Sequence, residues 1–516
     1  MTVDRDKVFD FLSVIIACFL LGLATVCFYG TGWLTYALIL AGVLLVLFLL
    51  FECAPGRVNL VIFMFFTFIF LLMHFFSCLE GESFLSWSRS VHFLSVFAFL
   101  YFSSRLAVGK AESRGLVFFM TAAILFIPLL NYQSLHISEL QIFIIQFVFV
   151  SVSFLFLRDA ACDSLPFFAF VLFVFFVMLF SNCMASAVDG VRASGLRVLY
   201  MLGHFMFAFS VYGVLRTFRW DIFLFFPPVC LSLLVCLFSV LSLWFSLEFP
   251  RDYNWVGESP LFGNIRHMGY FLCFSTVFFV CSLFWFRVNL FFSFLMCFLS
   301  FSLLFWNGGR GAVLSVFIGS ALVAFFAGFP FSRIFVFLVA VLASLLASAL
   351  FYVNSPGVGW LNWIVRVKGA DSMDALSSGR LEIWSYMIPY IKERIWLGWG
   401  GDGFASVWRS SNLVQAHNGF FQLLIEWGVL VACAITIFIG VLLLKGIKAV
   451  PLARGEARTY LVVGLSVSVS MLTLSMFDGV FYYGAPGTSL ALGLALLSAG
   501  VSISRLERCS DFSAKS

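Results

Sequence analysis

One histidine and two arginines stand where their side chains could transfer a proton and bind an anion. His417, in QAHNGFF, ends a polar stretch directly before a long apolar run. Histidine exchanges protons near neutral pH and can therefore act as a general base. Arg310, in WNGGRGAV, and Arg380, in SSGRLEIW, each follow a glycine where a helix is predicted to begin. We predict that these three residues are catalytic.

The two arginines oppose the dipole of the helices they begin. A cation in the first turn of a helix costs about 0.3–1 kcal/mol. The same cation becomes favourable when an anion occupies the site, because backbone N–H groups and the guanidinium then face one negative charge. Gly308 and Gly309 would let the backbone approach such a ligand. The pattern predicts a pocket for a phosphate or diphosphate, bound by Arg310 and Arg380.

Two further stretches place polar residues at predicted helix starts. Arg266 and His267 lie in LFGNIRHMGY, and Asn418 follows His417. We predict that Arg266, His267 and Asn418 also bind substrate. The alternative for an arginine at the membrane surface, such as Arg266, is that its side chain extends to lipid head groups.

The carboxylates give only a weak indication of a metal. Asp371 and Asp374 have the spacing D-x-x-D, which could hold a divalent cation, but two loop aspartates are more often solvated turn residues. Glu426 and Asp478 lie within or beside apolar runs, where a carboxylate tends to be paired. We interpret Glu426 as a residue that fixes helix packing. The sequence therefore predicts no metal site and no cofactor.

Membrane-spanning helices must position these residues. Of the 516 residues, 63% are hydrophobic and only 11% are charged, which excludes a soluble globular protein. Apolar runs of about 17–25 residues recur, and each could cross a hydrocarbon core about 30 Å thick. Because backbone groups in lipid must be satisfied within the segment, we expect helices rather than strands. The sequence predicts an all-α polytopic integral membrane protein. Its expected partner is the lipid bilayer, and no nucleic-acid partner is expected.

About sixteen runs are candidate spans, so we expect about 14–16 transmembrane helices. They cover residues 9–30, 33–53, 58–78, 91–107, 117–132, 138–157, 166–184, 198–215, 222–246, 267–286, 289–305, 310–327, 334–353, 418–444, 459–477 and 487–503. One alternation puts nearly all basic loops on one side, which is typical of the cytoplasm, together with both termini. The segment 354–417 is then the one long outer loop, and loops of this length are usually functional. We interpret residues 1–516 as a single membrane domain.

Three stretches, in this order, resemble the signatures of the O-antigen ligase superfamily. They are NGGRGA at 307–312, SSGRLEIW…WLGWGGDGF at 377–404 and AHNGFFQLLIEWGVL at 416–430. The superfamily includes O-antigen ligases, some O-antigen polymerases and bacterial protein O-oligosaccharyltransferases. The similarity covers the region 255–445, which would be the ligase-like catalytic region, and it includes the large periplasmic loop 354–417.

The resemblance implies a GT-C-type helical bundle in the bacterial inner membrane. Members take a glycan from undecaprenyl diphosphate at the periplasmic face, move it to an acceptor hydroxyl and are regarded as metal-independent. Carried over by position, Arg310 and Arg380 would bind the donor diphosphate, and His417 would accept the proton of the hydroxyl. Arg266 and His267 would lie near the site. Attack from the side opposite the leaving group would invert the anomeric carbon.

The acceptor is open on the sequence alone. An O-antigen ligase would use a sugar of the lipid A core, and this is our first expectation. An O-antigen polymerase would use the growing glycan, and a protein O-oligosaccharyltransferase would use a protein hydroxyl. A transporter of lipid-linked glycans is a further alternative, but transporters place charges near the middle of the bilayer. Here the conspicuous basic residues lie at the predicted outer rim.

Overall fold

The computed structural model describes residues 165–513, apart from 189–190, 192, 286–287, 356, 364–371, 373–376 and 409–412, together with a few positions between 138 and 150. The predicted spans 9–30, 33–53, 58–78, 91–107 and 117–132, and most of 138–157, lie outside the described residues. The chain divides into two compact units. The first comprises residues 1–153, 223–250 and 257–267, and the second comprises 154–222, 251–256 and 268–516.

In the first unit, the described residues form one long apolar helix, α10 (Phe226–Ser246). Pro227 and Pro228 lie in its first turn, where a missing backbone N–H is tolerated because it would have no partner within the helix. The short 3-10 helix η3 (Ile222–Phe225) precedes α10. Residues 257–264 of this unit form turns or have no regular structure, and residues 265–267 are the start of α11, whose remainder belongs to the second unit.

The second unit is helical wherever it has regular structure among the described residues. Its helices are α8 (Leu165–Ser186), α9 (Gly195–Phe218), α11 (Ile265–Phe284), α12 (Leu290–Asn307), α13 (Arg310–Phe326), α14 (Phe331–Leu350), α17 (Arg380–Glu393), α18 (Gly403–Val407), α19 (Gly419–Ala449), η4 (Val450–Leu452), α20 (Gly455–Ser475) and α21 (Gly484–Ser513). Eight helices in the described part are long and apolar enough to cross a membrane, and α13 is a shorter apolar helix. The all-α polytopic prediction is confirmed for this part of the chain.

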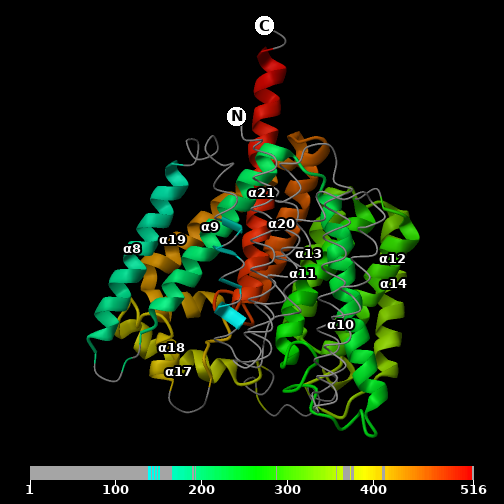
Figure 1. Ribbon diagram of the computed structural model, residues 1–516, viewed down its shortest axis with the longest axis horizontal. Coiled ribbons are helices and arrows are strands. Elements are labelled where there is room, and N and C mark those ends of the chain that lie inside the picture. Colours follow the sequence, from blue (N-terminus) through cyan, green and yellow to red (C-terminus); the bar gives the residue numbers. More distant parts are fainter. Residues whose placement is uncertain are drawn as a thin grey trace, which may run out of the picture. The chain divides into compact units, whose positions relative to one another are not determined.

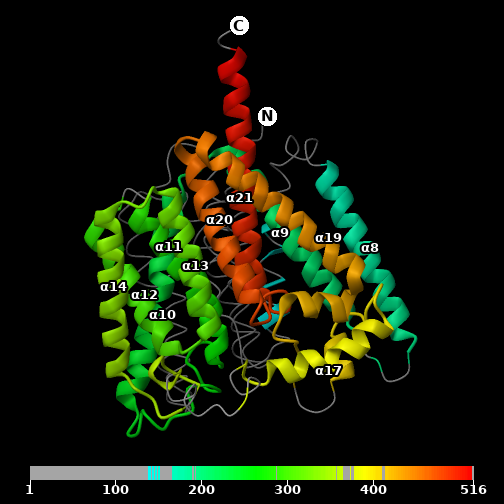
Figure 2. The same ribbon diagram turned by 180° about the vertical axis from the view of Figure 1, so that it is seen from behind.

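Helices α20 and α21 pack closely together near the middle of the second unit (Figures 1 and 2). Gly464 of α20 permits this approach, since a Cβ there would lie 2.5 Å from the backbone nitrogen of Leu497 in α21. Helix α13 packs on α20, and α12 packs on α14. On the other side, α9 packs on α21, while α8 contacts α9 and α19. The pair α20–α21 therefore joins two groups of helices.

Helix α19 is broken inside the predicted span 418–444. Gly428 has φ 72° and ψ −178°, which separates a short first part from the long second part. The break leaves backbone groups without partners within the helix, and the loop after α17 pairs with them. Trp399 donates its N–H to the carbonyl of Ile425 at 2.8 Å, and Gly400 donates to Glu426 at 2.8 Å. A Cβ on Gly428 would lie 2.3 Å from the carbonyl oxygen of Trp396, so glycine is required.

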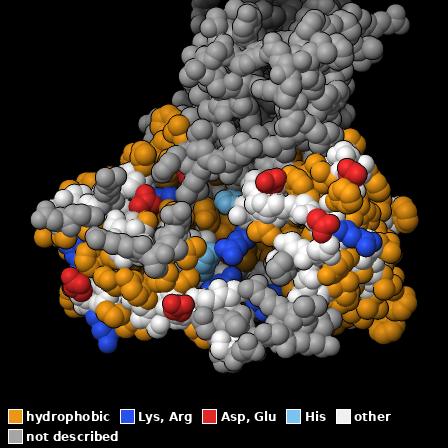
Figure 3. All heavy atoms as spheres, turned by 90° about the horizontal axis from the view of Figure 1, so that it is seen from below, with side chains coloured by type: hydrophobic (Ala, Val, Ile, Leu, Met, Phe, Trp, Pro, Cys, Tyr) orange, Lys and Arg blue, Asp and Glu red, His pale blue; other side chains and the backbone are white. Residues whose placement is uncertain are grey.

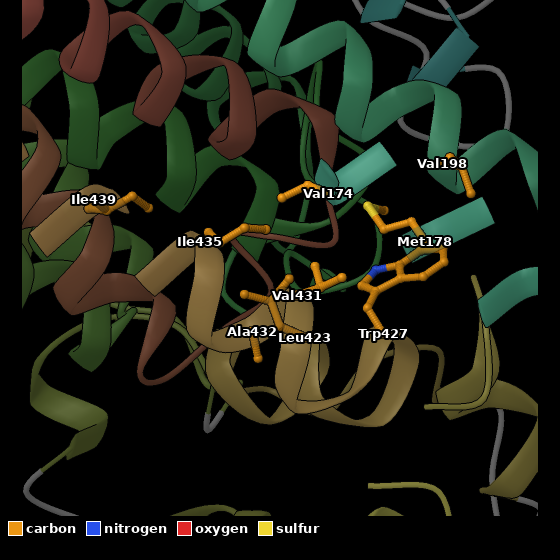
Figure 4. Close-up of a cluster of buried hydrophobic side chains, with 9 residues drawn as sticks. All are labelled: Val174, Met178, Val198, Leu423, Trp427, Val431, Ala432, Ile435 and Ile439. Carbon is orange, nitrogen blue, oxygen red and sulfur yellow. The ribbon is translucent and has the colours of Figure 1, made fainter. Parts of the chain in front are cut away.

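A hydrophobic cluster holds the broken helix against α8 and α9. Figure 4 shows Trp427, in the short first part of α19, directed toward Met178 of α8. Val431, beyond the break, belongs to the same buried cluster, as does Val198 of α9. The short part of α19 lies across the long part, beside α17 (Figure 2). The start of α19, with His417 and Asn418 directly before it, is thus fixed by packing.

The spacing along α17 predicts an apolar stripe of a helix that lies along the membrane surface or over the bundle. The stripe consists of Leu381, Trp384, Ile388, Ile391 and Ile395. In the structure Leu381, Ile388 and Ile395 are exposed, and the buried side chains of α17 are Ile383 and Met387. The helix is therefore apolar on two faces, one packed within the protein and one exposed. The exposed stripe suits contact with a membrane surface.

Candidate functional site

Arg310 and Arg380 lie on neighbouring segments. A guanidinium nitrogen of Arg310, Nη2, donates to the hydroxyl of Ser378 at 3.0 Å. Nη1 of Arg380 donates to the backbone carbonyl of Ser377 at 3.2 Å. Ser378 and Gly379 both adopt the left-handed conformation, with φ 65° and 77°, which turns the chain sharply before α17 begins. Both arginines are half-buried, so a ligand can still reach their side chains.

His417 is buried, 6% exposed, and faces a carboxylate. Its Nδ1 lies 3.3 Å from Oδ1 of Asp478, and Gln415 donates to the same oxygen at 2.9 Å. Because a carboxylate accepts hydrogen bonds, Nδ1 carries the proton in this pair and Nε2 is the nitrogen that can take up a proton. His417 also has φ 51°, an uncommon conformation for a residue other than glycine, and such residues cluster at functional sites.

Asn418 caps helix α19. Its side-chain oxygen accepts hydrogen bonds from the N–H groups of Phe420 at 3.0 Å and Phe421 at 3.1 Å. Its amide nitrogen donates to the carbonyl of Met476 at 3.2 Å. These contacts fix the start of α19 and tie it to the segment after α20. The contacts of Asn418 in the structure are those of a helix cap, and its predicted role in substrate binding stays a prediction.

Contacts between neighbouring residues bring together the segments that carry the three predicted catalytic residues. Gly311, next to Arg310, lies so close to Phe477 that a Cβ on it would be 2.9 Å from that side chain. Asp478, the next residue, contacts His417. From the other side, Trp384 of α17, one turn beyond Arg380, donates to the carbonyl of Ala416 at 2.9 Å. Figure 3 shows basic and histidine side chains near the middle of the face that carries α17.

Sequence reasoning missed Arg197, in the first turn of α9. Its Nε donates to Oδ1 of Asp402 at 2.8 Å, and its Nη1 donates to the carbonyl of Tyr482 at 3.0 Å. The guanidinium lies 3.9 Å from the centre of the Tyr482 ring, whose hydroxyl donates to Asp402 at 2.9 Å. Burial raises the pKa of Tyr482, so the phenol stays protonated and keeps this bond. The signal for Arg197 was the one used for Arg310, an arginine in the first turn of an apolar helix.

Further hydrogen bonds connect Asp402 to helix α19, and helix α19 to the residue before His417. The backbone N–H of Asp402 donates to Oε1 of Glu426 at 3.1 Å. One turn earlier in α19, Oε1 of Gln422 accepts from the backbone N–H of Ala416 at 2.7 Å. Glu426 therefore holds the loop after α17 against the broken helix, in agreement with the packing role predicted for it. Asp478 is the partner that the sequence did not assign to His417.

Arg266 and His267 belong to the first unit, in the first turn of α11. The backbone N–H of Arg266 donates to the side chain of Asn264 at 2.8 Å, which caps the helix. Arg266 is exposed and His267 is half-buried. Their predicted substrate contacts stay predictions.

Among the residues that the structure describes, no group of three or more His, Cys, Asp or Glu side chains could hold a metal ion. Asp371 and Asp374, the weak candidates from the sequence, lie outside the described residues.

Comparison with known proteins identifies the region that contains these residues. Residues 295–436 match the model of the family described as O-antigen ligase. The match includes Arg310, Arg380 and His417 and ends within α19. No curated protein matches the chain. Together with the apolar helices, the match supports a membrane enzyme of the O-antigen ligase and polymerase type, which transfers lipid-linked glycans. The match over residues 295–436 therefore supports a relationship of this region to the O-antigen ligase superfamily.

Proposed function

We propose that this protein transfers a glycan from undecaprenyl diphosphate to an acceptor hydroxyl at the periplasmic face of the bacterial inner membrane. Arg310 and Arg380 bind the diphosphate, and His417 is the general base. One observation carries the proposal: hydrogen bonds and close contacts join the segments that bear these three side chains. The family match supports the reaction class.

The arginines stabilise the leaving group. Negative charge grows on the diphosphate as the bond to the anomeric carbon breaks. Two guanidinium groups at adjacent helix starts, Arg310 and Arg380, meet this charge with N–H donors from side chains and backbone. A guanidinium can grip two phosphate oxygens at once, which an ammonium cannot do. No divalent cation is required in this proposal, because the arginines supply the positive charge.

His417 removes the proton of the attacking hydroxyl. Asp478 holds the imidazole through Nδ1 and favours the protonated ring that forms during the reaction. Nε2 accepts the proton while the hydroxyl oxygen attacks the anomeric carbon. The base acts on the side opposite the diphosphate, so the configuration at that carbon inverts. The products are the glycosylated acceptor and undecaprenyl diphosphate.

For the acceptor, we propose a sugar of the lipid A core, which makes the protein an O-antigen ligase. The polymerase and the protein O-oligosaccharyltransferase use the same donor chemistry, so they differ only in the hydroxyl that enters. Purified full-length protein, a labelled lipid-linked glycan and the three acceptors, each offered separately, distinguish them. Label transferred to the lipid A core supports the ligase, and label transferred only to glycan or protein overturns that choice.

The variant His417→Asn tests the base. Asparagine tolerates the left-handed conformation of this residue but cannot accept the proton, so the backbone is kept and the chemistry is removed. We expect the transfer rate to fall by about 10²–10⁴-fold. Retention of the labelled donor and the unfolding temperature should stay as in the wild type. Undiminished transfer would refute the role of His417.

The same assay separates an enzyme from a transporter. Transfer of label in detergent needs no membrane and no gradient, so it excludes transport as the primary activity. A protein that moves labelled lipid across vesicles but never forms a glycosylated product would overturn the proposal.

A further inference from the structure

A long apolar cavity lies within the second unit, between α8, α9, α19 and α21. Its volume is about 770 Å³. The lining is mostly aliphatic and aromatic, with side chains such as Phe209, Phe438 and Leu494. Along α21 it extends from Gly487 to Cys509. At about 1.5 Å per residue, that length is on the order of the hydrocarbon thickness of a bilayer. The cavity therefore has the length and chemistry of a site for lipid chains.

One end of the cavity can be located relative to the candidate site. The starts of α9, α19 and α21 lie near the site. Ser194, directly before α9, donates its N–H to the carbonyl of Gly401 at 2.8 Å, and Tyr482, before α21, donates its hydroxyl to Asp402. Asn418, next to His417, caps α19. The three helices then run away from the site. Residues near their far ends, such as Lys445 in α19 and Arg505 in α21, lie on the opposite face of the unit.

The far end of the cavity is basic. Arg216, Lys445 and Arg505 line it, one from each of the three helices, and no acidic side chain is among the described residues that line the cavity. Lys445 and Arg505 are exposed, and Arg216 is half-buried with a hydrogen bond to Tyr212 at 3.1 Å. Basic residues at the mouth of an apolar pocket between membrane helices suit an anionic head group whose chains enter the pocket. A neutral lipid would gain nothing from the three cations.

We propose that this cavity binds an anionic phospholipid of the leaflet opposite the candidate site, with its head group on Arg216, Lys445 and Arg505 and its acyl chains along α9, α19 and α21. In the topology expected from the sequence, this is the cytoplasmic leaflet. The proposal goes beyond glycan transfer and does not depend on it. The lipid would hold α9 and α19 together. Arg197 in the first turn of α9 contacts the loop after α17, and His417 lies directly before α19.

The chain offers a matched pair of variants for the test. Lys445→Gln/Arg505→Gln removes two cations that line the cavity. Lys448→Gln/Arg508→Gln removes two exposed cations one turn further along the same helices, which do not line it. Full-length protein is delipidated in detergent and titrated with phosphatidylglycerol, cardiolipin or phosphatidylcholine. Native mass spectrometry then measures the lipid bound.

We expect phosphatidylglycerol and cardiolipin to bind more tightly than phosphatidylcholine. The cavity variant should weaken the dissociation constant for the anionic lipids by about 30-fold, and the control variant by less than about 3-fold. Equal losses in the two variants, or equal binding of phosphatidylcholine, would overturn the proposal. So would displacement of the bound lipid by neutral undecaprenol alone, because the cavity would then hold a prenyl chain. These lipid-binding measurements do not depend on glycan transfer. The variant His417→Asn should therefore bind the anionic lipids as the wild type does, whether or not it transfers glycan.

Discussion

Several helices in the described part of the chain have an arginine in the first turn, and those of α9, α13 and α17 meet different partners. Arg197 at the start of α9 is buried, 8% exposed, and bonded to the carboxylate of Asp402. Arg310 and Arg380, at the starts of α13 and α17, are half-buried and donate to a serine hydroxyl and a serine carbonyl. The same local sequence signal thus occurs in two structural settings.

The difference lies in access to ligands. Arg197 is enclosed by Asp402 and by the ring of Tyr482, so its guanidinium joins α9 to the loop after α17. Arg310 and Arg380 lie around one sharp turn at Ser378 and Gly379, where a ligand can approach from solvent. At the start of α9 the arginine binds a carboxylate of the protein itself, whereas at the starts of α13 and α17 it is open to a ligand. Burial distinguishes the two cases.

The largest expected effect is on stability, for Arg197→Met. Removal of one partner from a buried ion pair leaves an uncompensated charge and costs about 3–5 kcal/mol of unfolding free energy. Asp402, Glu426 and Tyr482 would lose the cation they share. We expect a clearly lower midpoint of thermal unfolding in detergent, measured by the fluorescence of the many tryptophans. Donor binding by the fraction that remains folded should be retained.

The double variant Arg197→Met/Asp402→Asn is the control. It removes the orphaned carboxylate, and asparagine tolerates the φ of 58° at this position. Much of the lost stability should return. If Arg197→Met unfolds at the wild-type temperature and instead loses donor binding, Arg197 belongs with Arg310 and Arg380, and burial does not distinguish the two settings.

The next effect is on rate, for Arg310→Ala and Arg380→Ala. Loss of one donor that stabilises a developing negative charge typically lowers the rate by about 10²–10³-fold. We expect this loss in the glycan-transfer assay with little change in the unfolding temperature. Arg380→Lys should also be impaired, because an ammonium does not reproduce the two-pronged contact of a guanidinium.

Lys392→Ala supplies the comparison on the same helix. Lys392 lies in the last turn of α17 and is exposed, so its loss removes one positive charge without touching the turn at Ser378. Transfer by this variant should match the wild type. A comparable loss of rate would mean that the general positive field of α17, rather than the two helix starts, attracts the donor.

The fold of the described region followed from the sequence where hydrophobic runs are long. Each span predicted from residue 166 onward coincides with a helix, because lipid forces the backbone of an apolar run to bond within itself. The break in α19 was not predicted. Gly428 in the apolar run gave the only local signal, and a glycine in a membrane helix is usually compatible with regular geometry. The backbone of Trp399 and Gly400, which bonds the carbonyl groups freed by the break, lies in the loop after α17 and is not adjacent to Gly428 in the sequence.

The site was predictable in its positive charges and less so in its carboxylates. Arg310, Arg380 and His417 stood out because charged residues are rare in this chain and because each lies at or just before the start of a helix. Asp478 was noticed, but its pairing with His417 depends on how the segment after α20 folds back. The same holds for Arg197 and Asp402. Sequence spacing identifies which residues can do chemistry, whereas the approach of two distant segments decides which of them meet.

The smallest expected effect separates two neighbouring serines. Ser378 holds Arg310 through its hydroxyl, whereas Ser377 holds Arg380 through its backbone carbonyl. Ser378→Ala removes one hydrogen bond, with a net value of about 0.5–1.5 kcal/mol, from the positioning of Arg310. We expect kcat/KM for the lipid-linked donor to fall by about 2–10-fold.

Ser377→Ala keeps the carbonyl that Arg380 uses, so transfer should be unchanged. Its hydroxyl accepts from the N–H of Leu381 at 3.3 Å, and the loss of that contact should lower only the unfolding temperature, slightly. Ser378→Gly completes the set, because glycine relaxes the left-handed conformation while it also removes the hydroxyl. It should lose transfer as Ser378→Ala does, yet unfold no earlier than the wild type. If Ser378→Gly transfers normally, the hydroxyl of Ser378 does not position Arg310, and the turn alone sets the geometry of this helix start.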